Sequence, residues 1–179
     1  MIHDQAAKIR LVLFDVDGVL TDGKIVLHAD GTESKVFDIK DGTAIVWAQR
    51  LGLQVGFLSA RTSAATAQRA AQLGITLVHQ GVPSKLETYD QIADSLLLED
   101  EQIAYMGDDI LDLPVLTRVG LAAAPADAAQ DVRMRVHWVS AANGGGGAAR
   151  ALIELILRAQ DKWESILATY MAAAQDQQA

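Results

Sequence analysis

The chain has 179 residues, of which 50% are hydrophobic, contains no cysteine, and carries a formal net charge of -8. This length and composition predict one packed domain and exclude a disordered or fibrous chain. The negative charge disfavours nucleic acid as a partner, the lack of cysteine excludes disulfides and thiolate metal sites, and no apolar run is long enough to span a membrane. Because the charged segment 1–10 lacks the apolar core of a signal peptide, a cytoplasmic location is expected.

Short apolar runs alternate with helical patterns along the chain. The runs predict buried strands at 9–14, 54–58, 76–78, 103–106 and 120–123. Helices are expected between them at 43–51, 63–73, 84–96 and 111–118. This alternation predicts an α/β fold with a doubly wound, mainly parallel, Rossmann-like sheet. Ligands of such sheets bind beyond the carboxyl ends of the strands.

Two segments depart from the alternation. Residues 24–38 hold two extended runs around Asp30-Gly31, a pair that favours a tight reversal, so a β-hairpin is expected. The glycine-rich segment 143–147 is predicted to separate the sheet from a final helix over 148–174. No insertion is long enough to form a cap domain, so the site is expected to be open unless a neighbouring subunit covers it.

The first predicted strand ends in two carboxylates, Asp15 and Asp17, followed by Gly18. Side chains two residues apart in an extended chain point the same way, so both acids are expected in one pocket. Burying them together is unfavourable unless a cation or a proton compensates. We therefore interpret Asp15 as a nucleophile and Asp17 as the acid for a leaving oxygen and the base for water. An aspartate that caps a turn is the ordinary alternative, but it explains the three residues together poorly.

A second acidic cluster begins at Asp108, just after another predicted strand. Since parallel strands end at one edge of the sheet, Asp108 is expected beside the first pair. The Asp15 and Asp108 carboxylates and the Asp17 carbonyl oxygen together predict a Mg²⁺ site, with Asp109 and Asp112 in a surrounding shell that orients ligands or water. Alternatively, these acids only cap the helix and interact with its dipole. The presence of two acidic clusters at two strand ends disfavours this alternative.

Phosphoryl transfer also needs positive charge and hydrogen-bond donors around the phosphate oxygens. Ser59, at a strand end, can offer its hydroxyl and its backbone N–H, and Arg61 lies just beyond it. Lys85 begins a helix, where it can neutralise Asp15 and a bound phosphate. Any one serine or lysine is more commonly a surface residue, but the order of these motifs favours a site.

The succession DVDG, Ser59, Lys85 and GDDILD resembles the signature motifs of the haloacid dehalogenase-like superfamily. Within it, FDVDGVLTDG, the hairpin, HQGVPSK and the glycine-rich tail are similar to the 3-deoxy-D-manno-octulosonate 8-phosphate phosphatases, from about Arg10 to Leu157. The resemblance implies a Mg²⁺-dependent phosphatase that forms an aspartyl-phosphate and acts on a sugar-acid phosphate destined for lipopolysaccharide. It also implies a homotetramer in which the hairpins pack together.

The same resemblance implies ligand contacts. Magnesium would be held by Asp15, Asp17 and Asp108. The implied substrate contacts are Asp17, Asp38, Ile39, Lys40, Asp41, Gly42, Arg61, Arg69 and Lys85. Two positions depart from the family pattern: Val46 stands where an arginine is expected, and the tail reads GGGGAARA where relatives read closer to GGRGAVRE. Both changes remove cations that could bind a sugar-acid carboxylate, whereas Arg150 is retained.

Three alternatives remain open at this point. A signalling receiver domain also gathers acids, a hydroxyl and a lysine at strand ends, but it has no leaving alcohol to protonate and so no need of Asp17. An inactive assembly domain, like the one fused to sugar-acid cytidylyltransferases, has no need of the complete set of catalytic side chains. A 2-keto-3-deoxynononate 9-phosphate phosphatase is the third alternative. Its substrate differs by one carbon in length and by a hydroxyl.

Overall fold

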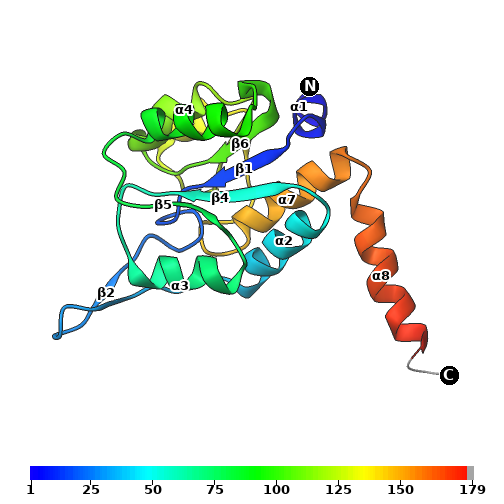
Figure 1. Ribbon diagram of the computed structural model, residues 1–179, viewed down its shortest axis with the longest axis horizontal. Coiled ribbons are helices and arrows are strands. Elements are labelled where there is room, and N and C mark those ends of the chain that lie inside the picture. The colour runs from blue at the N-terminus through cyan, green and yellow to red at the C-terminus, as the bar shows by residue number, and fades with distance from the viewer. Residues whose placement is uncertain (177–179) are drawn as a thin grey trace.

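A six-stranded sheet forms the centre of the structure, a computed structural model that describes residues 1–176, with side chains through Ala172 (Figure 1). In spatial order the strands are β5 (Leu77–His79), β4 (Gln54–Leu58), β1 (Leu11–Phe14), β6 (Ile103–Met106), β7 (Leu121–Ala124) and β8 (Trp138–Val139). Every neighbouring pair is parallel. The strand order reverses at β1, which confirms the doubly wound, Rossmann-like α/β fold.

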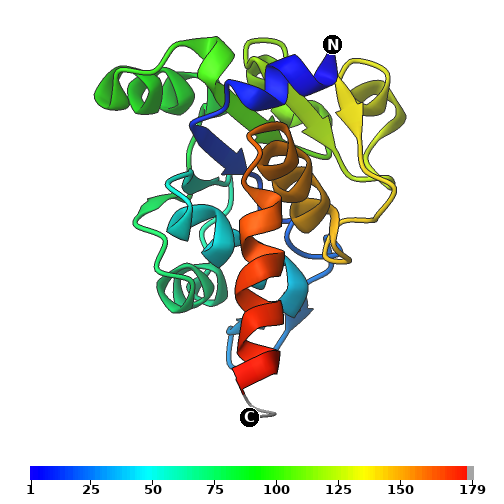
Figure 2. The same ribbon diagram turned by 90° about the vertical axis from the view of Figure 1, so that its right-hand side faces the viewer.

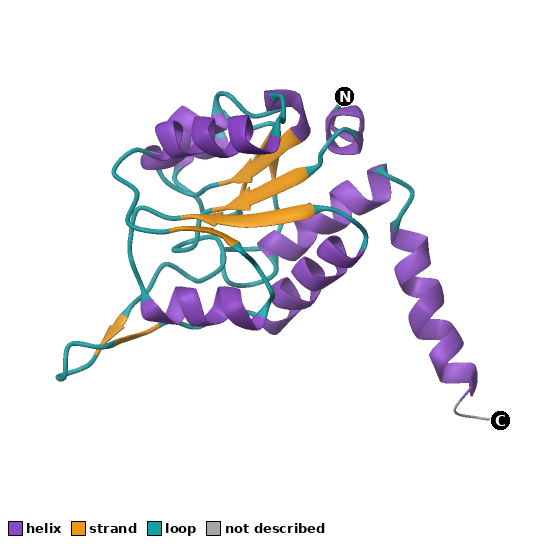
Figure 3. Cartoon of the chain, in the orientation of Figure 1, coloured by secondary structure: helices purple, strands orange, loops and turns teal. Residues whose placement is uncertain are grey.

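Helices cover both faces of the sheet, as Figure 3 shows. One face carries α1 (Ile2–Ala7), α2 (Ile39–Arg50), α3 (Ala64–Gln72) and α7 (Ala148–Ala159). The other carries α4 (Lys85–Leu96), α5 (Leu113–Leu116) and α6 (Gln130–Arg133). Strand β1 is fully buried, and its side chains alternate between the two faces of the sheet. Val12 and Phe14 pack into the core under the first group of helices, and Leu11 and Leu13 pack into the core under the second. No helix within residues 1–176 is long and apolar enough to cross a membrane.

The expected hairpin projects from the domain (Figure 1). Its strands β2 (Val26–Leu27) and β3 (Glu33–Ser34) are antiparallel and shorter than the extended runs suggested. The turn places Gly31 at a φ of 85°, which glycine adopts without strain. Between β1 and β4 the chain adds only this hairpin and α2, and between β4 and α4 it adds only α3 and β5, so residues 1–176 contain no cap domain at either position.

Helix boundaries follow capping side chains. Helices α3 and α4 begin after Ser63 and Ser84, each of which accepts a hydrogen bond from a backbone N–H in the first turn. Helix α2 begins at Ile39, four residues before the expected start, because Asp38 caps it. Gly52 and Gly74 follow α2 and α3 with positive φ, a conformation in which helices commonly end at glycine.

Some short elements differ from the expectation. The helix predicted at 111–118 is instead a 3₁₀ turn, η2 (Ile110–Asp112), followed by the single turn of α5. Strands β5 and β7 lie one residue further along the chain than predicted, and β1 begins two residues later. Helices α1 and α6, strand β8 and the 3₁₀ turn η1 (Asp100–Gln102) were not predicted, because segments of two to six residues carry too little periodicity to recognise.

The predicted single helix over 148–174 is wrong, because it consists of α7 and a separate helix, α8 (Trp163–Asp176). Asp161 adopts a left-handed conformation between them, and the backbone N–H of Lys162 donates to the carbonyl of Leu157. This is a glycine-free version of a common helix-ending turn. The break lets Trp163 and Tyr170 pack edge-on against Trp47, whose indole N–H donates to the Tyr170 hydroxyl. In Figure 2, α8 faces the viewer and descends in front of the domain.

Candidate active site

The carboxyl ends of three adjacent strands carry the predicted catalytic side chains. Strand β1 pairs with both β4 and β6, so the residues that follow them, Asp15, Ser59 and Asp108, come to one edge of the sheet. They share a cavity of about 280 Å³. The cavity is lined by Asp15, Asp17, Gly23, Ser59, Ala60, Arg61, Lys85, Asp108, Asp109, Leu111 and Asp112. Every predicted catalytic and metal residue therefore lies in this cavity.

Lys85 is the positive centre of the buried part of the cavity. Its ammonium lies 3.0 Å from Asp15 Oδ1 and also donates to Asp112 and to the Tyr105 hydroxyl. Ser84 fixes the start of α4 and so places Lys85 at the first helical position, pointing toward β1. The structure thus pairs the predicted nucleophile with the predicted lysine.

Asp112 holds this part of the site together. Its Oδ1 accepts from Lys85 and Tyr105, and its Oδ2 accepts from the backbone N–H groups of Asp108 and Asp109, at 3.0 and 3.2 Å. Four accepted hydrogen bonds occupy both oxygens of a fully buried carboxylate. This supports the expectation that Asp112 does not bind the metal directly but orients Lys85 and the loop that carries Asp108.

Three carboxylates, those of Asp15, Asp108 and Asp112, each place an oxygen within 4.8 Å of the others. Burial, followed by the charge of Asp112, raises the pKa of Asp15 to about 6. Burial, followed by the charges of Asp15 and Asp112, raises the pKa of Asp108 to about 7. Because Lys85 is the one ammonium among them, full ionisation leaves two uncompensated negative charges. Hard oxygen ligands with this charge fit a divalent cation such as Mg²⁺, and Asp15 and Asp108 have oxygens available to bind it.

Gly18 allows the two acidic loops to approach each other. Its φ is 87°, and a Cβ atom there would collide with the carboxylate of Asp108. A side chain at this position is therefore excluded twice, by backbone conformation and by space. The glycine that follows Asp17 in the DVDG motif is needed for the convergence of the first and second acidic clusters.

The carboxylate of Asp17 does not belong to that group of three, and it faces the hairpin. Lys35 places its ammonium 2.6 and 2.8 Å from the two Asp17 oxygens, and Arg61 Nε lies 3.6 Å from one of them. Sequence reasoning missed Lys35, because it sits in an extended run with no recognisable motif. Its only signal was a cation in the hairpin inserted directly after the catalytic loop.

Ser59 lines the cavity, but one of its predicted roles is wrong. Its backbone N–H donates to the carbonyl of His79 at 2.9 Å, so this group is committed to the sheet and cannot bind phosphate. The Ser59 hydroxyl accepts from the Arg61 backbone N–H at 3.3 Å and keeps its own proton to donate. The half-exposed Arg61 side chain lies 3.0 Å from Glu33 on the hairpin.

The other predicted substrate contacts lie outside the catalytic cavity, around the first turn of α2. Asp38 caps the helix, and its carbonyl accepts from the Arg69 guanidinium at 3.1 Å. The Asp41 carboxylate accepts from the backbone N–H groups of Arg150 and Gly147, at 2.7 and 3.3 Å. Burial raises the pKa of Asp41 to about 6. These side chains therefore have structural partners within the chain.

Three further predicted positions complete this second group. Ile39 and Lys40 are exposed, and Gly42 packs against Arg69 so closely that a Cβ atom would collide with the guanidinium. With Val46, Ile39, Gly42 and Arg69 line a separate cavity of about 290 Å³ that Trp47, Arg50 and Tyr170 also border. Within one copy of the chain, the predicted substrate contacts thus form two groups.

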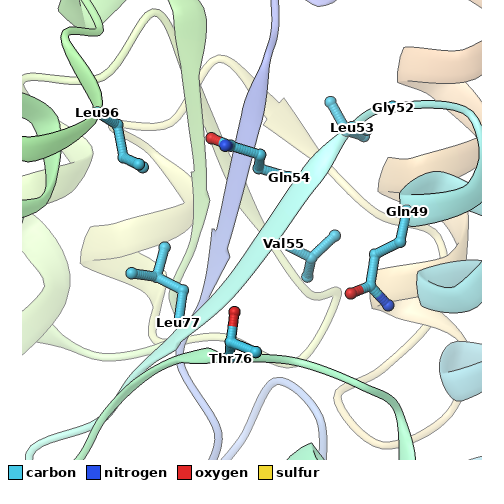
Figure 4. Close-up of a pocket in the computed structure, with 8 residues that line it drawn as sticks. All are labelled: Gln49, Gly52, Leu53, Gln54, Val55, Thr76, Leu77 and Leu96. Atoms are coloured by element: carbon cyan, nitrogen blue, oxygen red, sulfur yellow. The ribbon is translucent and has the colours of Figure 1, made fainter.

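A larger cavity of about 400 Å³ lies at the amino ends of β4 and β5 (Figure 4). Gln54 and Val55 from β4 and Leu77 from β5 line it. It contains no charged side chain. Since ligands of doubly wound sheets bind at the carboxyl ends, the smaller acidic cavity is the candidate active site.

Comparison with known proteins agrees with this geometry. Residues 57–152 match the model of the haloacid dehalogenase-like hydrolases. The 3-deoxy-D-manno-octulosonate 8-phosphate phosphatase of Yersinia pestis is 41% identical over 163 residues, which are 91% of this chain and 87% of that enzyme. The chain belongs to the haloacid dehalogenase-like hydrolase family. The resemblance inferred from the motifs is therefore confirmed.

Solved structures of haloacid dehalogenase-like hydrolases share the fold. The 3-deoxy-D-manno-octulosonate 8-phosphate phosphatase of Moraxella catarrhalis, in complex with magnesium, phosphate and KDO, superimposes with a TM-score of 0.92 at 33% identity, covering 94% of this chain and 97% of that one. The cobalt-bound phosphatase of Haemophilus influenzae gives a TM-score of 0.85 at 38% identity, covering 88% and 92%. Relatives named as phosphatases, together with the retained Asp17, disfavour the receiver-domain alternative.

Proposed function

We propose that the chain is a Mg²⁺-dependent phosphatase that hydrolyses 3-deoxy-D-manno-octulosonate 8-phosphate to the free sugar acid and inorganic phosphate, a reaction that supplies lipopolysaccharide synthesis. The proposal rests on the convergence of Asp15, Lys85 and Asp108 in one cavity. The similarity to enzymes named for this substrate, over about nine tenths of the chain, supports the choice of substrate.

In the first half-reaction, the Asp15 carboxylate attacks phosphorus. A P–O bond forms to Asp15 while the bond to the sugar oxygen breaks, and Asp17 gives that oxygen a proton. The product alcohol leaves, and the phosphoryl group stays on Asp15. With a pKa of about 6, Asp15 is mostly ionised near neutral pH, as a nucleophile must be.

In the second half-reaction, water attacks the aspartyl-phosphate. Asp17, now a carboxylate, takes a proton from the water as the new P–O bond forms and the bond to Asp15 breaks. Inorganic phosphate is released, and both aspartates return to their starting states. One side chain thus serves as acid and then as base, which requires Asp17 to stay near the reacting oxygen in both steps.

Positive charge for the phosphate comes from several directions. Mg²⁺, held by the carboxylates of Asp15 and Asp108 and the carbonyl of Asp17, would neutralise charge on the phosphate oxygens. Lys85 balances Asp15 on the other side, and the Ser59 hydroxyl can donate to the phosphate. We assign these roles as part of the proposal.

We further propose that the enzyme works as a homotetramer assembled through the hairpin. The second group of predicted substrate contacts, Asp38–Gly42 and Arg69, does not line the catalytic cavity of its own chain. In the proposed tetramer, a substrate touches the first group of one copy and the second group of its neighbour. The exposed apolar side chains of the hairpin, Leu27 and Val36, support packing against another copy.

A substrate panel tests the proposed activity. Phosphate release from the octulosonate 8-phosphate, the nononate 9-phosphate and simple sugar phosphates is measured with Mg²⁺ or with EDTA. The highest kcat/KM is expected for the octulosonate 8-phosphate, with activity lost in EDTA and in Asp15→Asn. Equal or faster hydrolysis of the nononate 9-phosphate would overturn the substrate assignment, and activity retained in Asp15→Asn would overturn the nucleophile.

A further inference from the structure

The hairpin places a buried lysine against the proposed general acid. Lys35 Nζ bonds both oxygens of Asp17, and the Lys35 side chain is only 1% exposed. Glu33, also on the hairpin, lies 3.9 Å from the same ammonium and anchors Arg61 from the loop after β4. Two carboxylates and two cations thus join the hairpin to the catalytic loops.

Burial distinguishes this ion pair from the others on the protein surface. An exposed lysine–carboxylate pair contributes about 0–1 kcal/mol, because water screens it and the side chains lose entropy. A buried ammonium loses its hydration and is tolerated only with well-placed partners, so its geometry is tightly constrained. The contact between Lys35 and Asp17 is therefore a fixed part of the site.

The two proposed catalytic aspartates are held by separate lysines. Asp15 is paired with Lys85 from α4, and Asp17 is paired with Lys35 from the hairpin. In-line displacement puts the leaving oxygen on the side of phosphorus opposite the attacking Asp15. The acid must therefore be held away from the nucleophile, and Lys35 directs the Asp17 carboxylate toward the hairpin and away from the Asp15, Asp108 and Asp112 cluster.

We propose that Lys35 is a positioning residue for Asp17, so that the hairpin supports the active site from behind Asp17 as well as projecting from the domain. The inference rests on the proposed function, because it assumes that Asp17 transfers the proton to the leaving oxygen. In this proposal Lys35 contacts Asp17 and acts through it, not on the phosphate or the leaving oxygen. It fixes the direction of the carboxylate that protonates that oxygen.

Leaving-group dependence separates this role from simple anchoring of the hairpin. A sugar alcohol leaves only with a proton from Asp17, whereas p-nitrophenolate leaves readily without one. A misplaced Asp17 therefore slows the sugar phosphate far more than p-nitrophenyl phosphate. A distorted cavity or a lost magnesium site slows both substrates together. The ratio of the two kcat/KM values is the informative quantity.

The experiment compares Lys35→Met with wild type on both substrates in Mg²⁺. The kcat/KM for the sugar phosphate is expected to fall about 10- to 100-fold, the usual cost of losing a partner that orients a functional group. The value for p-nitrophenyl phosphate is expected to fall less than about threefold, since little protonation is required. Lys8→Met is the matched control, because it removes a lysine–carboxylate pair, that with Glu101, from the exposed surface.

A double variant tests whether Lys35 acts through Asp17. In an Asp17→Asn background, Lys35→Met is expected to cause no further loss on the sugar phosphate. If Lys35→Met does not fold, Lys35→Gln, which keeps a donor but not the charge, is measured in its place. Equal losses on both substrates, no loss on either, or additive losses in the double variant would overturn the inference. A wild-type protein without phosphatase activity would instead overturn the proposed function.

Discussion

At the scale of single residues, the acidic cluster carries more negative charge than its own lysine balances. Asp15 and Asp108 have pKa values of about 6 and about 7, raised from 3.8, first by burial and then by neighbouring carboxylates. Their charged forms are therefore less favourable in the metal-free folded protein than in the unfolded chain. A bound divalent cation reverses this, so metal binding and proton release are linked.

This linkage predicts how Mg²⁺ stabilises the protein at different pH values. The folded pKa values lie above the unfolded ones, so the stability that these two groups contribute is fully present below about pH 4 and is lost as pH rises through 6 to 7 without metal. Mg²⁺ compensates the charges that appear in that range. The difference in Tm between Mg²⁺ and EDTA should therefore grow from pH 5 to pH 7.5, measured by thermal unfolding.

Asp108→Asn is the control for this pH series. It removes one proposed ligand and one of the two titrating groups, so the Mg²⁺-dependent rise in Tm should be small at every pH. Asp41, whose pKa is also raised to about 6, titrates with and without metal and cancels in the difference. An Mg²⁺ effect of equal size at pH 5 and pH 7.5 would contradict the assignment.

The site residues that could be predicted from the sequence are those that lie in a recognisable motif at the end of a strand or the start of a helix. Asp15, Asp108 and Lys85 follow or precede recognisable elements, so the parallel sheet alone brings them together. Lys35 has no motif, and its contact with Asp17 depends on how the hairpin folds back. The predicted role of the Ser59 backbone N–H is wrong because this group donates to the carbonyl of His79. His79 is the last residue of β5, which ends one residue beyond the predicted strand.

At the scale of elements, the glycine-rich segment is closely packed against the catalytic loop. Gly145 donates its backbone N–H to the carbonyl of Val19, at 2.9 Å. A Cβ atom on Gly144 would overlap the carbonyl of Gly18, whereas a Cβ on Gly146 would lie 3.3 Å from the carbonyl oxygen of Asn143. The sequence predicted only a separator between the sheet and a final helix, but the structure uses several of these glycines for close contact.

Alanine substitutions should show whether these glycines are needed for close packing or only for chain flexibility. Gly144→Ala forces apart two backbone segments and should lower the free energy of unfolding by about 1 to 3 kcal/mol or more. Each kcal/mol corresponds to a fall in Tm of about 2–4 °C for a chain of this size. It should also lower kcat, because Gly18 directly follows Asp17. Gly146→Ala, the matched control, should change both values little, since its neighbour needs to move by only tenths of an ångström. Similar Tm and kcat for the two variants would contradict this account.

The elements predicted correctly have local signals at their ends. Serine at 63 and 84 and glycine at 52 and 74 fix four helix boundaries. The break before α8 has no such signal, because Asp161 takes a conformation that usually selects glycine or asparagine. Packing decides it: Trp163 and Ile166 are buried against the core only if the chain turns there.

At the scale of the whole molecule, two projections leave apolar side chains in water. The hairpin exposes Leu27 and Val36, each 76% exposed, and α8 exposes Tyr170 and Met171. Lys35 and Glu33 tie the base of the hairpin to the catalytic loops, whereas its exposed apolar side chains have no contact that covers them within the described residues. The proposed homotetramer would cover these side chains and would bring the second group of predicted substrate contacts to the catalytic cavity of another copy.

The assembly can be tested with charged substitutions in the hairpin. Sedimentation should give the wild type four times the monomer mass of 19.1 kDa. Leu27→Asp and Val36→Asp should shift the mass toward monomers, because each would bury an unpaired carboxylate at the interface. The kcat/KM for the sugar phosphate should fall with the assembly, since the two groups of contacts separate. Leu97→Asp is the control, since Leu97 is 87% exposed at the end of α4 and has a positive φ that aspartate tolerates. A wild-type monomer with full activity would contradict both the assembly and the shared site.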